Sequence, residues 1–189
     1  YTLDDFDMRD LSLHLLDIVQ NSIAAQATKI DVHLEINPKL DYLALIISDN
    51  GKGMNAEFLQ QITSPFTTTR TTRKVGLGLP LLMQNAERTG GYLEITSSVG
   101  KGTTLRAVFH PNHIDCPPMG DIAGVAAQLI CSFPNISFSF SFETDTSEFS
   151  ITTLEIAQAL EGIPINDTSV FPLVKQVIES SLEELKFPV

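Results

Sequence analysis

The segment from residue 30 to residue 47 constrains the fold most, because it predicts two neighbouring strands joined by a short turn. Apolar and polar residues alternate from Ile30 to Ile36, which is typical of a strand with one buried face. The turn Asn37-Pro38-Lys39 follows, and residues 42–47 are nearly all apolar, so the second strand is expected inside a sheet. Strands separated by so short a turn favour antiparallel pairing.

Helices and two further strands surround this pair. Apolar residues at helical spacing predict helices over residues 11–27, 57–62 and 78–88, and strands are expected over residues 92–96 and 103–109. The order is therefore helix, two strands, helix, long loop, helix, two strands. This order predicts an α+β fold in two layers, a sandwich with its helices gathered on one face of the sheet.

The remaining residues predict a second, smaller unit. Residues 111–118 (PNHIDCPP) are typical of a linker between a first domain over 8–110 and an accessory domain over 119–189. The accessory domain is expected to have the order αββαα, and Phe138, Phe140 and Phe142 face one side of its first strand. About seventy residues are few for independent stability, so we expect this unit to pack on the first.

The charge is negative and unevenly distributed. The chain has 12 basic and 23 acidic residues, a net charge of −11 that would repel a nucleic-acid backbone, so no nucleic acid is expected as a partner. Residues 1–110 hold 10 basic and 12 acidic side chains, whereas residues 111–189 hold 2 and 11. The two segments are therefore expected to do different jobs, the acidic one docking a protein partner or a second copy of the chain.

Membrane insertion, export and a cysteine-based metal site are all unexpected. No apolar run approaches the roughly 20 residues that cross a bilayer, and the acidic start YTLDDFDMRD is unlike a secretory signal. Cys116 and Cys131 form no CxxC pair and histidine is scarce, which argues against a zinc site or a disulfide scaffold. We expect two reduced thiols in a cytoplasmic protein.

Two polar residues of the first predicted helix, Asp17 and Asn21, are hard to explain as packing. Their spacing of four places both on one face, yet their neighbours Ile18 and Val19 are expected in the core. The pair is therefore expected at a cavity edge, where Asn21 offers an amide oxygen to magnesium and Asp17 can orient or deprotonate a water. An ordinary polar pair on an exposed helix face is the alternative.

The sequence DNGKGM, residues 49–54, places a carboxylate and two glycines directly after the buried strand. An Asp at a strand end, beside glycines that admit close approach, can bind the exocyclic amine of a flat heterocycle. A simple hairpin turn is the alternative, because Asn-Gly is the usual hairpin dipeptide. The following segment argues against the hairpin, since it predicts a helix and a loop rather than a pairing strand.

The loop over residues 64–80 has the composition of a polyphosphate site. Free backbone N–H groups at a helix N-terminus, together with cations and glycines, favour phosphate binding. A solvated surface loop is the alternative, and it explains the polarity but not the glycines. The residues concerned are Thr67, Thr68, Thr69, Arg70, Thr71, Thr72, Arg73, Lys74, Gly76, Leu77 and Gly78.

These features occur in an order that resembles the ATP-binding module of the GHKL superfamily, which includes sensor histidine kinases, gyrase-type topoisomerases, the heat-shock chaperone ATPase and MutL-type repair ATPases. The resemblance covers about residues 8–110, and it implies bound ATP and Mg²⁺ in a Bergerat-type fold, an α/β sandwich with helices on one face of a mixed sheet. The run TTTRTTRKVGLGLP most resembles the histidine kinase branch, whereas NSIAAQATKI is more similar to the MutL branch. The matching boxes are NSIAAQATKI (21–30), DNGKGM (49–54), SPFTTTR (64–70), VGLGLP (75–80) and GKGTT (100–104).

The resemblance implies roles for three polar residues. Asn21 falls on the family's magnesium-binding Asn, and Asp17 falls where the gyrase and MutL branches keep a general-base Glu and the kinases another polar residue. Asp49 falls on the adenine-binding Asp. The chain departs from the pattern at Ala24, where kinases often have Lys and the MutL branch has Asp, and the shorter Asp17 weakens the case for efficient water activation.

Further nucleotide contacts are implied in the same way. Gly51 and Gly53 shape the adenine pocket, Thr103 joins its hydrogen-bond network, and Phe66 anchors an ATP lid over residues 64–75. The remaining implied contacts are Ala25, Met54, Thr68, Thr69, Arg70, Arg73, Lys74, Gly76, Leu77, Gly78 and Leu79.

The leading hypothesis is a kinase-like protein that binds Mg-ATP and transfers phosphate to a separate protein, as a histidine kinase module or an anti-sigma-type serine kinase would. Only about ten residues precede the first helix, so no phosphoacceptor helix is expected, and His14 is expected to be a structural or surface histidine. A non-catalytic module, in which ATP orders the lid and exposes a partner surface, is the alternative. A MutL-like or gyrase-like hydrolase would need a transducer domain, for which residues 111–189 are too few and too acidic.

Overall fold

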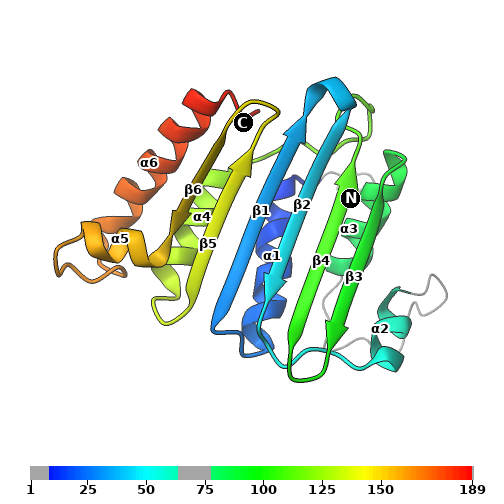
Figure 1. Cartoon of the computed structure of the whole chain (residues 1–189), viewed down its shortest axis with the longest axis horizontal. Helices are drawn as coiled ribbons and strands as arrows, with labels where there is room; N and C mark the ends of the chain where they lie inside the picture. The colour runs from blue at the N-terminus through cyan, green and yellow to red at the C-terminus, as the bar shows by residue number, and fades with distance from the viewer. Residues whose placement is uncertain (1–8, 64–77, 189) are drawn as a thin grey trace, which may run out of the picture.

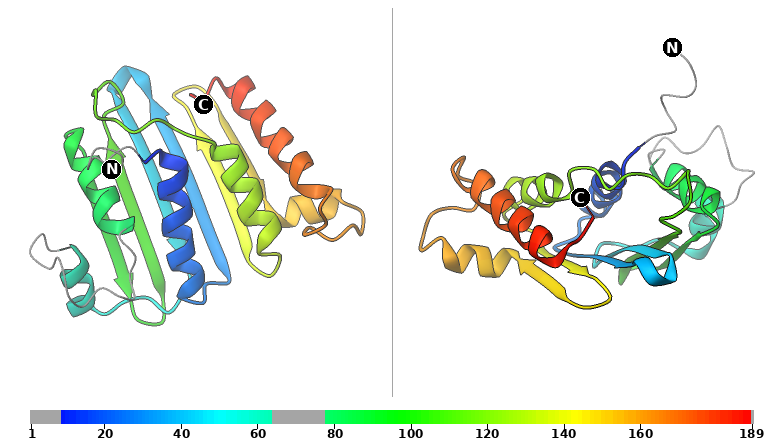
Figure 2. Two further views of the ribbon diagram at one scale, coloured as in Figure 1. Left: turned by 180° about the vertical axis from the view of Figure 1, so that it is seen from behind. Right: turned by 90° about the horizontal axis from the view of Figure 1, so that it is seen from above.

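A computed structural model describes residues 9–63 and 78–188 of the chain, and its centre is a six-stranded mixed sheet in the order β3-β4-β2-β1-β5-β6 (Figure 1). Helices α1, α3, α4 and α6 cover one face of this sheet (Figure 2). The predicted α+β sandwich is confirmed. The elements are α1 Leu11–Ala24, β1 Lys29–Asn37, η2 Pro38–Leu40, β2 Tyr42–Asp49, α2 Ala56–Thr63, α3 Gly78–Arg88, β3 Tyr92–Ser98, β4 Gly102–Phe109, α4 Ile122–Ser132, β5 Ser137–Glu143, β6 Glu148–Thr152, α5 Thr153–Ala159 and α6 Val170–Leu185.

The two strands predicted from residues 30–47 form the middle of the sheet. β1 and β2 pair antiparallel with Val32 opposite Ile47, and β2 pairs antiparallel with β4, so Ile47 also lies opposite Leu105. The alternation in β1 buries one side of the strand under the helices, whereas β2 buries residues on both of its faces, among them Ala44 and Leu45. Both strand predictions are confirmed, and β2 ends at Asp49 beside the helical layer.

The C-terminal residues extend the same sheet rather than forming a separate one. β5 pairs parallel with β1, with Phe140 opposite Val32, and β6 adds an antiparallel edge. Phe138, Phe140 and Phe142 are fully buried and belong to the same hydrophobic core as α1 and β1. The expectation that residues 119–189 pack on the first unit is met by a shared sheet and a shared core, while the division at 111–118 stays a prediction.

Helix α1 is held at both ends by specific contacts. Asp10 accepts a 2.9 Å hydrogen bond from the N–H of Leu13, as a helix N-cap does. At the other end, Gln26 takes a left-handed conformation (φ 61°), and the N–H of Ala27 donates to the carbonyl of Ser22. The helix therefore stops at Ala24, three residues before the predicted end, because this turn closes it.

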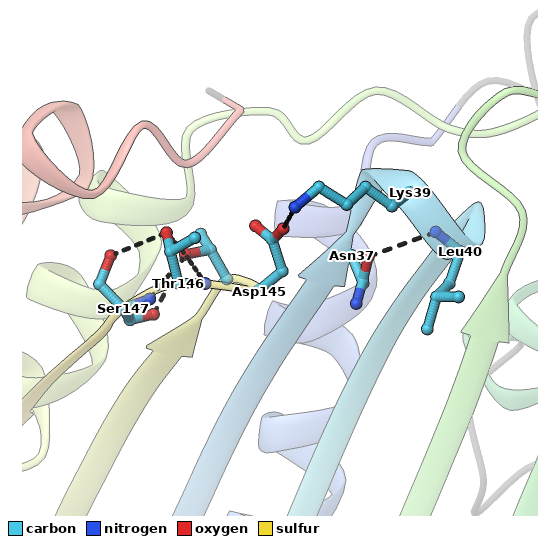
Figure 3. Close-up of polar contacts among 7 residues, drawn as sticks. Asn37, Lys39, Leu40, Asp145, Thr146 and Ser147 are labelled. Atoms are coloured by element: carbon cyan, nitrogen blue, oxygen red, sulfur yellow. Dashed lines mark hydrogen bonds and ion pairs between the residues drawn. The ribbon is translucent and has the colours of Figure 1, made fainter.

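The sheet face away from the helices is polar. Ser48 and Thr104 share a 2.6 Å hydrogen bond across β2 and β4. At one end of the sheet, Lys39 Nζ lies 2.7 Å from Asp145 Oδ2, and this ion pair links the β1–β2 connection to the β5–β6 turn (Figure 3).

Among the described helices, none combines the length and apolar character needed to cross a bilayer.

Candidate functional site

A cavity of about 250 Å³ opens where the C-terminal half of α1, the end of β2 and the strands β3 and β4 meet. Its walls are mainly apolar, and a carboxylate, an amide and two hydroxyls enter it from Asp49, Asn21, Ser22 and Thr103. Such a site, with apolar walls and a few fixed polar groups, suits a flat organic ligand. The predicted site residues that line the cavity are Asn21, Ala25, Asp49, Gly53, Met54, Leu79 and Thr103.

The Asp49 carboxylate is held in a fixed orientation at the end of β2. Its Oδ1 accepts a 2.8 Å hydrogen bond from the N–H of Gly51, and its Oδ2 accepts a 2.6 Å hydrogen bond from the Ser22 hydroxyl. Each carboxylate oxygen has a second lone pair, so both can still accept from a ligand. The carboxylate is therefore a pre-oriented acceptor for an amine.

The turn after Asp49 needs glycine at residue 53. Gly53 has φ +67°, and a Cβ placed there would lie 2.0 Å from the carbonyl oxygen of Ser98. The turn thus packs its backbone directly on the β3–β4 connection. Gly53 was expected to shape the adenine pocket, and close packing on the Ser98 carbonyl also requires a glycine there.

Thr103 lies opposite Asp49 on β4 and belongs to a chain of hydroxyls. Its Oγ1 is 2.8 Å from the Ser97 hydroxyl, which in turn accepts a 2.8 Å hydrogen bond from the N–H of Met54. These contacts join the turn after β2 to both β3 and β4. Thr103 is therefore held at the cavity wall by its neighbours.

Asn21 and Asp17 lie on the same side of α1 but in different surroundings. Asn21 lines the cavity, and within the described residues its side-chain amide makes no hydrogen bond. Asp17 does not line the cavity; it forms an ion pair with Arg9. Asp17 also lies against the start of α3, since a Cβ placed on Gly78 would be 3.1 Å from Asp17 Cβ.

Several implied nucleotide contacts fall outside the residues that the structure describes. They are Phe66, Thr68, Thr69, Arg70, Arg73, Lys74, Gly76 and Leu77. Gly78 and Leu79, which follow them, begin α3, and Leu79 reaches the cavity.

The site also contains residues that no sequence pattern indicated. Ser22 and Ser97 position Asp49 and Thr103, as described above, and isolated hydroxyls carry no pattern that would reveal this. Phe58 of α2 and Lys52 also line the cavity. Both lie within nine residues of Asp49 in the sequence, and this proximity is the one sequence signal that could have indicated that they line the cavity. The other unselected lining residues are Ile18, Ala24, Ile47, Ile95 and Leu105.

The cavity does not use the buried histidine of α1. His14 is fully buried, and its Nε2 accepts a 2.8 Å hydrogen bond from the Asn85 amide of α3. Burial, followed by the charge of Arg9, lowers the pKa of His14, so the ring is neutral at pH 7. His14 was expected to be a structural or surface histidine, and its complete burial supports the structural role.

The two cysteines are also structural. They are not bonded to each other, and burial raises the pKa of both the Cys116 and Cys131 thiols. Thiols that stay protonated at neutral pH are poor nucleophiles.

Comparison with known proteins matches the part of the chain that contains the cavity. The family described as "Histidine kinase-, DNA gyrase B-, and HSP90-like ATPase" matches residues 6–113. The chain is 38% identical to the sensor kinase CckA of Brucella abortus over 58% of its own length and 11% of that protein. It is 30% identical to sporulation kinase C of Bacillus subtilis over 54% of its length and 24% of that protein. The chain thus spans a minor part of both relatives.

The fold also has a counterpart among solved structures. The crystal structure of the N-terminal domain of a DNA repair protein superposes with a TM-score of 0.53 at 19% identity, covering 75% of this chain and 51% of that one. At this identity, the likeness concerns the fold.

Proposed function

The chain belongs to the histidine kinase-, DNA gyrase B- and HSP90-like ATPase family, and from this premise we propose that it binds Mg-ATP beside Asp49 and transfers the γ-phosphoryl group to a separate protein. Its sensor kinase relatives support a kinase-like ATPase domain. The observation that carries the proposal is the Asp49 carboxylate, fixed by Ser22 and Gly51 at a cavity with apolar walls.

Asp49 supports the choice of adenine. The exocyclic amine of adenine donates hydrogen bonds, and a carboxylate can only accept them. Guanine would present a carbonyl oxygen at the same position, and two acceptors repel each other. Thr103, on the neighbouring strand, would contribute a hydroxyl next to the ring, while Met54 and Phe58, which also line the cavity, would provide apolar contact.

Asn21 fits a magnesium site on the side of the cavity where the phosphates would lie. Its amide is uncommitted among the described residues, and amide oxygens are suitable ligands for this hard cation. Magnesium bound there would offset the charge of the phosphates. Gly76 and Gly78 would offer backbone N–H groups to the same phosphates, with Thr68, Thr69, Arg70, Arg73 and Lys74 over them, as the family resemblance implies.

The protein would act mainly by positioning. Phosphoryl transfer breaks the bond between the γ-phosphorus and the bridging oxygen and forms a bond to the acceptor, and its transition state needs alignment and charge stabilisation more than covalent help. An acceptor on another protein fits the absence of an exposed histidine on α1. The acidic residues 111–189 would dock that protein or a second copy of the chain.

A non-catalytic, ATP-gated interaction module is the second candidate. Two observations favour it: Ala24 lines the cavity where a longer polar residue would reach the phosphates, and Asp17 is engaged by Arg9 instead of facing the cavity. In such a module, nucleotide would change partner affinity without turnover.

Calorimetry with Mg-ATP and Mg-GTP tests the proposal. Wild-type protein is expected to prefer ATP, and Asp49→Asn should weaken ATP binding by about 10- to 100-fold, because a hydrogen bond to a charged group contributes roughly 1.5–3 kcal/mol. Asp31→Asn is the control, since Asp31 lies on the open sheet face and pairs with Lys29. Equal ATP binding by wild type and Asp49→Asn would refute the adenine site. Assays of phosphate release and phosphotransfer then separate kinase, hydrolase and binding module.

A further inference from the structure

The N-terminal end of α1 carries a cation that no assigned role explains. Arg9, one residue before the N-cap Asp10, forms an ion pair through Nη1 with Oδ2 of Asp17, two turns further along the helix. The side chains are 35% and 31% exposed, so the pair is partly shielded from water. Asp17 falls where the gyrase and MutL branches of the family keep a general-base Glu, and in this chain its carboxylate is engaged by a guanidinium.

The backbone two and three residues after Arg9 is held by hydrogen bonds to another segment. The N–H groups of Leu11 and Ser12 donate 2.9 and 3.0 Å hydrogen bonds to the carbonyls of Pro118 and Met119. These contacts, with the Asp10 cap, anchor the start of α1 to the segment before α4. Arg9 therefore reaches Asp17 from directly before an anchored helix start.

The ion pair lies next to the start of α3. A Cβ placed on Gly78 would be 3.1 Å from Asp17 Cβ and 3.6 Å from Asp17 Oδ2, so the Asp17 side chain lies beside the first residue of that helix. Under the proposed function, the phosphates of ATP lie at this helix start. The pair is accordingly placed at the phosphate end of the site, one turn from Asn21.

We propose that Arg9 is a positioning residue that holds Asp17 in an ion pair and thereby restrains hydrolysis of bound ATP, so that the γ-phosphoryl group is kept for transfer. The inference rests on the proposed function. In hydrolysis, a water oxygen bonds to the γ-phosphorus, the bond to the bridging oxygen breaks, ADP leaves with the electron pair, and the water proton passes to a base. Asp17 can take that proton when its carboxylate is released from Arg9.

The test compares ATP hydrolysis by wild type, Arg9→Gln and Arg9→Lys. Partly exposed ion pairs are weak, so Arg9→Gln should raise kcat by about two- to five-fold with KM within about two-fold of wild type. Arg9→Lys keeps a cation beside Asp17 and should stay near the wild-type rate. Lys29→Gln, which removes a cation of the open sheet face, is the matched control and should leave kcat unchanged.

Asp17→Asn identifies the group on which Arg9 acts. If Arg9 restrains Asp17, the double variant Arg9→Gln/Asp17→Asn hydrolyses ATP no faster than Asp17→Asn alone. An unchanged or lower kcat in Arg9→Gln, or a rise that persists in the double variant, overturns the inference. Calorimetry distinguishes failure of this inference from failure of the proposed function. If the wild-type protein does not bind ATP, both fail. If ATP binds in a way that depends on Asp49 but kcat does not rise in Arg9→Gln, only this inference is refuted.

Discussion

The hydroxyl of Ser22 donates a 2.6 Å hydrogen bond to Oδ2 of Asp49 and so joins the last turns of α1 to the end of β2. Ser22 is only 4% exposed. Because the N–H of Gly51 holds the other carboxylate oxygen, the orientation of Asp49 is set before any ligand arrives. Pre-orientation of this kind lowers the entropic cost of binding.

Ser22→Ala should therefore weaken ATP binding without removing it. Loss of one hydrogen bond to a charged group corresponds to about 1.5 kcal/mol, or roughly ten-fold in Kd measured by calorimetry. Ser12→Ala is the matched control, because Ser12 is equally buried on α1 but donates to Asp10 at the far end. If both variants bind ATP as wild type does, Ser22 does not support Asp49.

Gly53→Ala should be strongly destabilising, because both its conformation and its surroundings exclude a side chain. The left-handed backbone costs an alanine about 1–2 kcal/mol, and overlap with the Ser98 carbonyl adds about 1–3 kcal/mol. The free energy of unfolding, measured with denaturant, should fall by about 3 kcal/mol.

Gly100→Ala separates the two contributions to the Gly53 effect. Gly100 is also left-handed (φ +77°), but nothing lies within 4 Å of a Cβ placed there. This variant should lose only the conformational contribution, about 1–2 kcal/mol. Equal losses at both glycines would show that packing on Ser98 contributes nothing.

Local periodicity was sufficient to predict most of the fold. The alternation in β1, the apolar run of β2 and the helical spacing in α1 and α3 are each properties of a short segment, and the structure contains all of them. The predicted end of α1 was three residues too late, because Gln26 takes a left-handed conformation that is more usual for Gly or Asn.

Contacts between distant segments could not be predicted in the same way. The parallel pairing of β5 with β1 joins Phe140 to Val32 across more than a hundred residues, and no local pattern encodes it. In the site, Asp49 could be predicted because it follows a buried strand, and Asn21 because it is a polar residue among the apolar residues of a helix. Ser22 and Ser97 did not, because a serine acquires its role only when the fold brings a partner to it.

His14 should make stability depend on pH. Burial lowers its pKa from the ordinary 6.5, and the charge of Arg9 adds to this effect. Below pH 6.5 the unfolded chain binds a proton that the folded chain does not, so stability falls as pH decreases through this range. The contribution is at most about 1.4 kcal/mol per pH unit.

Denaturant unfolding of His14→Gln between pH 7.5 and 5 tests this dependence. The variant should lose less stability than wild type as the pH falls below 6.5, whatever its stability at pH 7.5. His113→Gln is the control, since the His113 side chain is 41% exposed. Parallel pH profiles for wild type and His14→Gln would contradict the assignment.

Phe140→Ala tests whether the shared sheet makes the chain one cooperative unit. Phe140 is fully buried, lies opposite Val32 of β1 and stacks on Phe138 with ring centroids 5.9 Å apart. Truncating it should cost about 3–5 kcal/mol. Because the lost contacts belong to a core that includes α1 and β1, the whole chain should unfold in one transition at lower denaturant, and the ATP-binding signal should disappear in that same transition.

Phe149→Ala provides the comparison, because Phe149 is only partly buried on the edge strand β6, where it stacks on Phe142. It should cost less than Phe140→Ala and leave the transition single. An independent domain over residues 119–189 would behave differently: Phe140→Ala would split unfolding into two steps and leave ATP binding intact after the first. That result would mean that the parallel β1–β5 pairing joins two separately stable units, whereas a single transition means that the nucleotide site depends on the C-terminal strands for its stability.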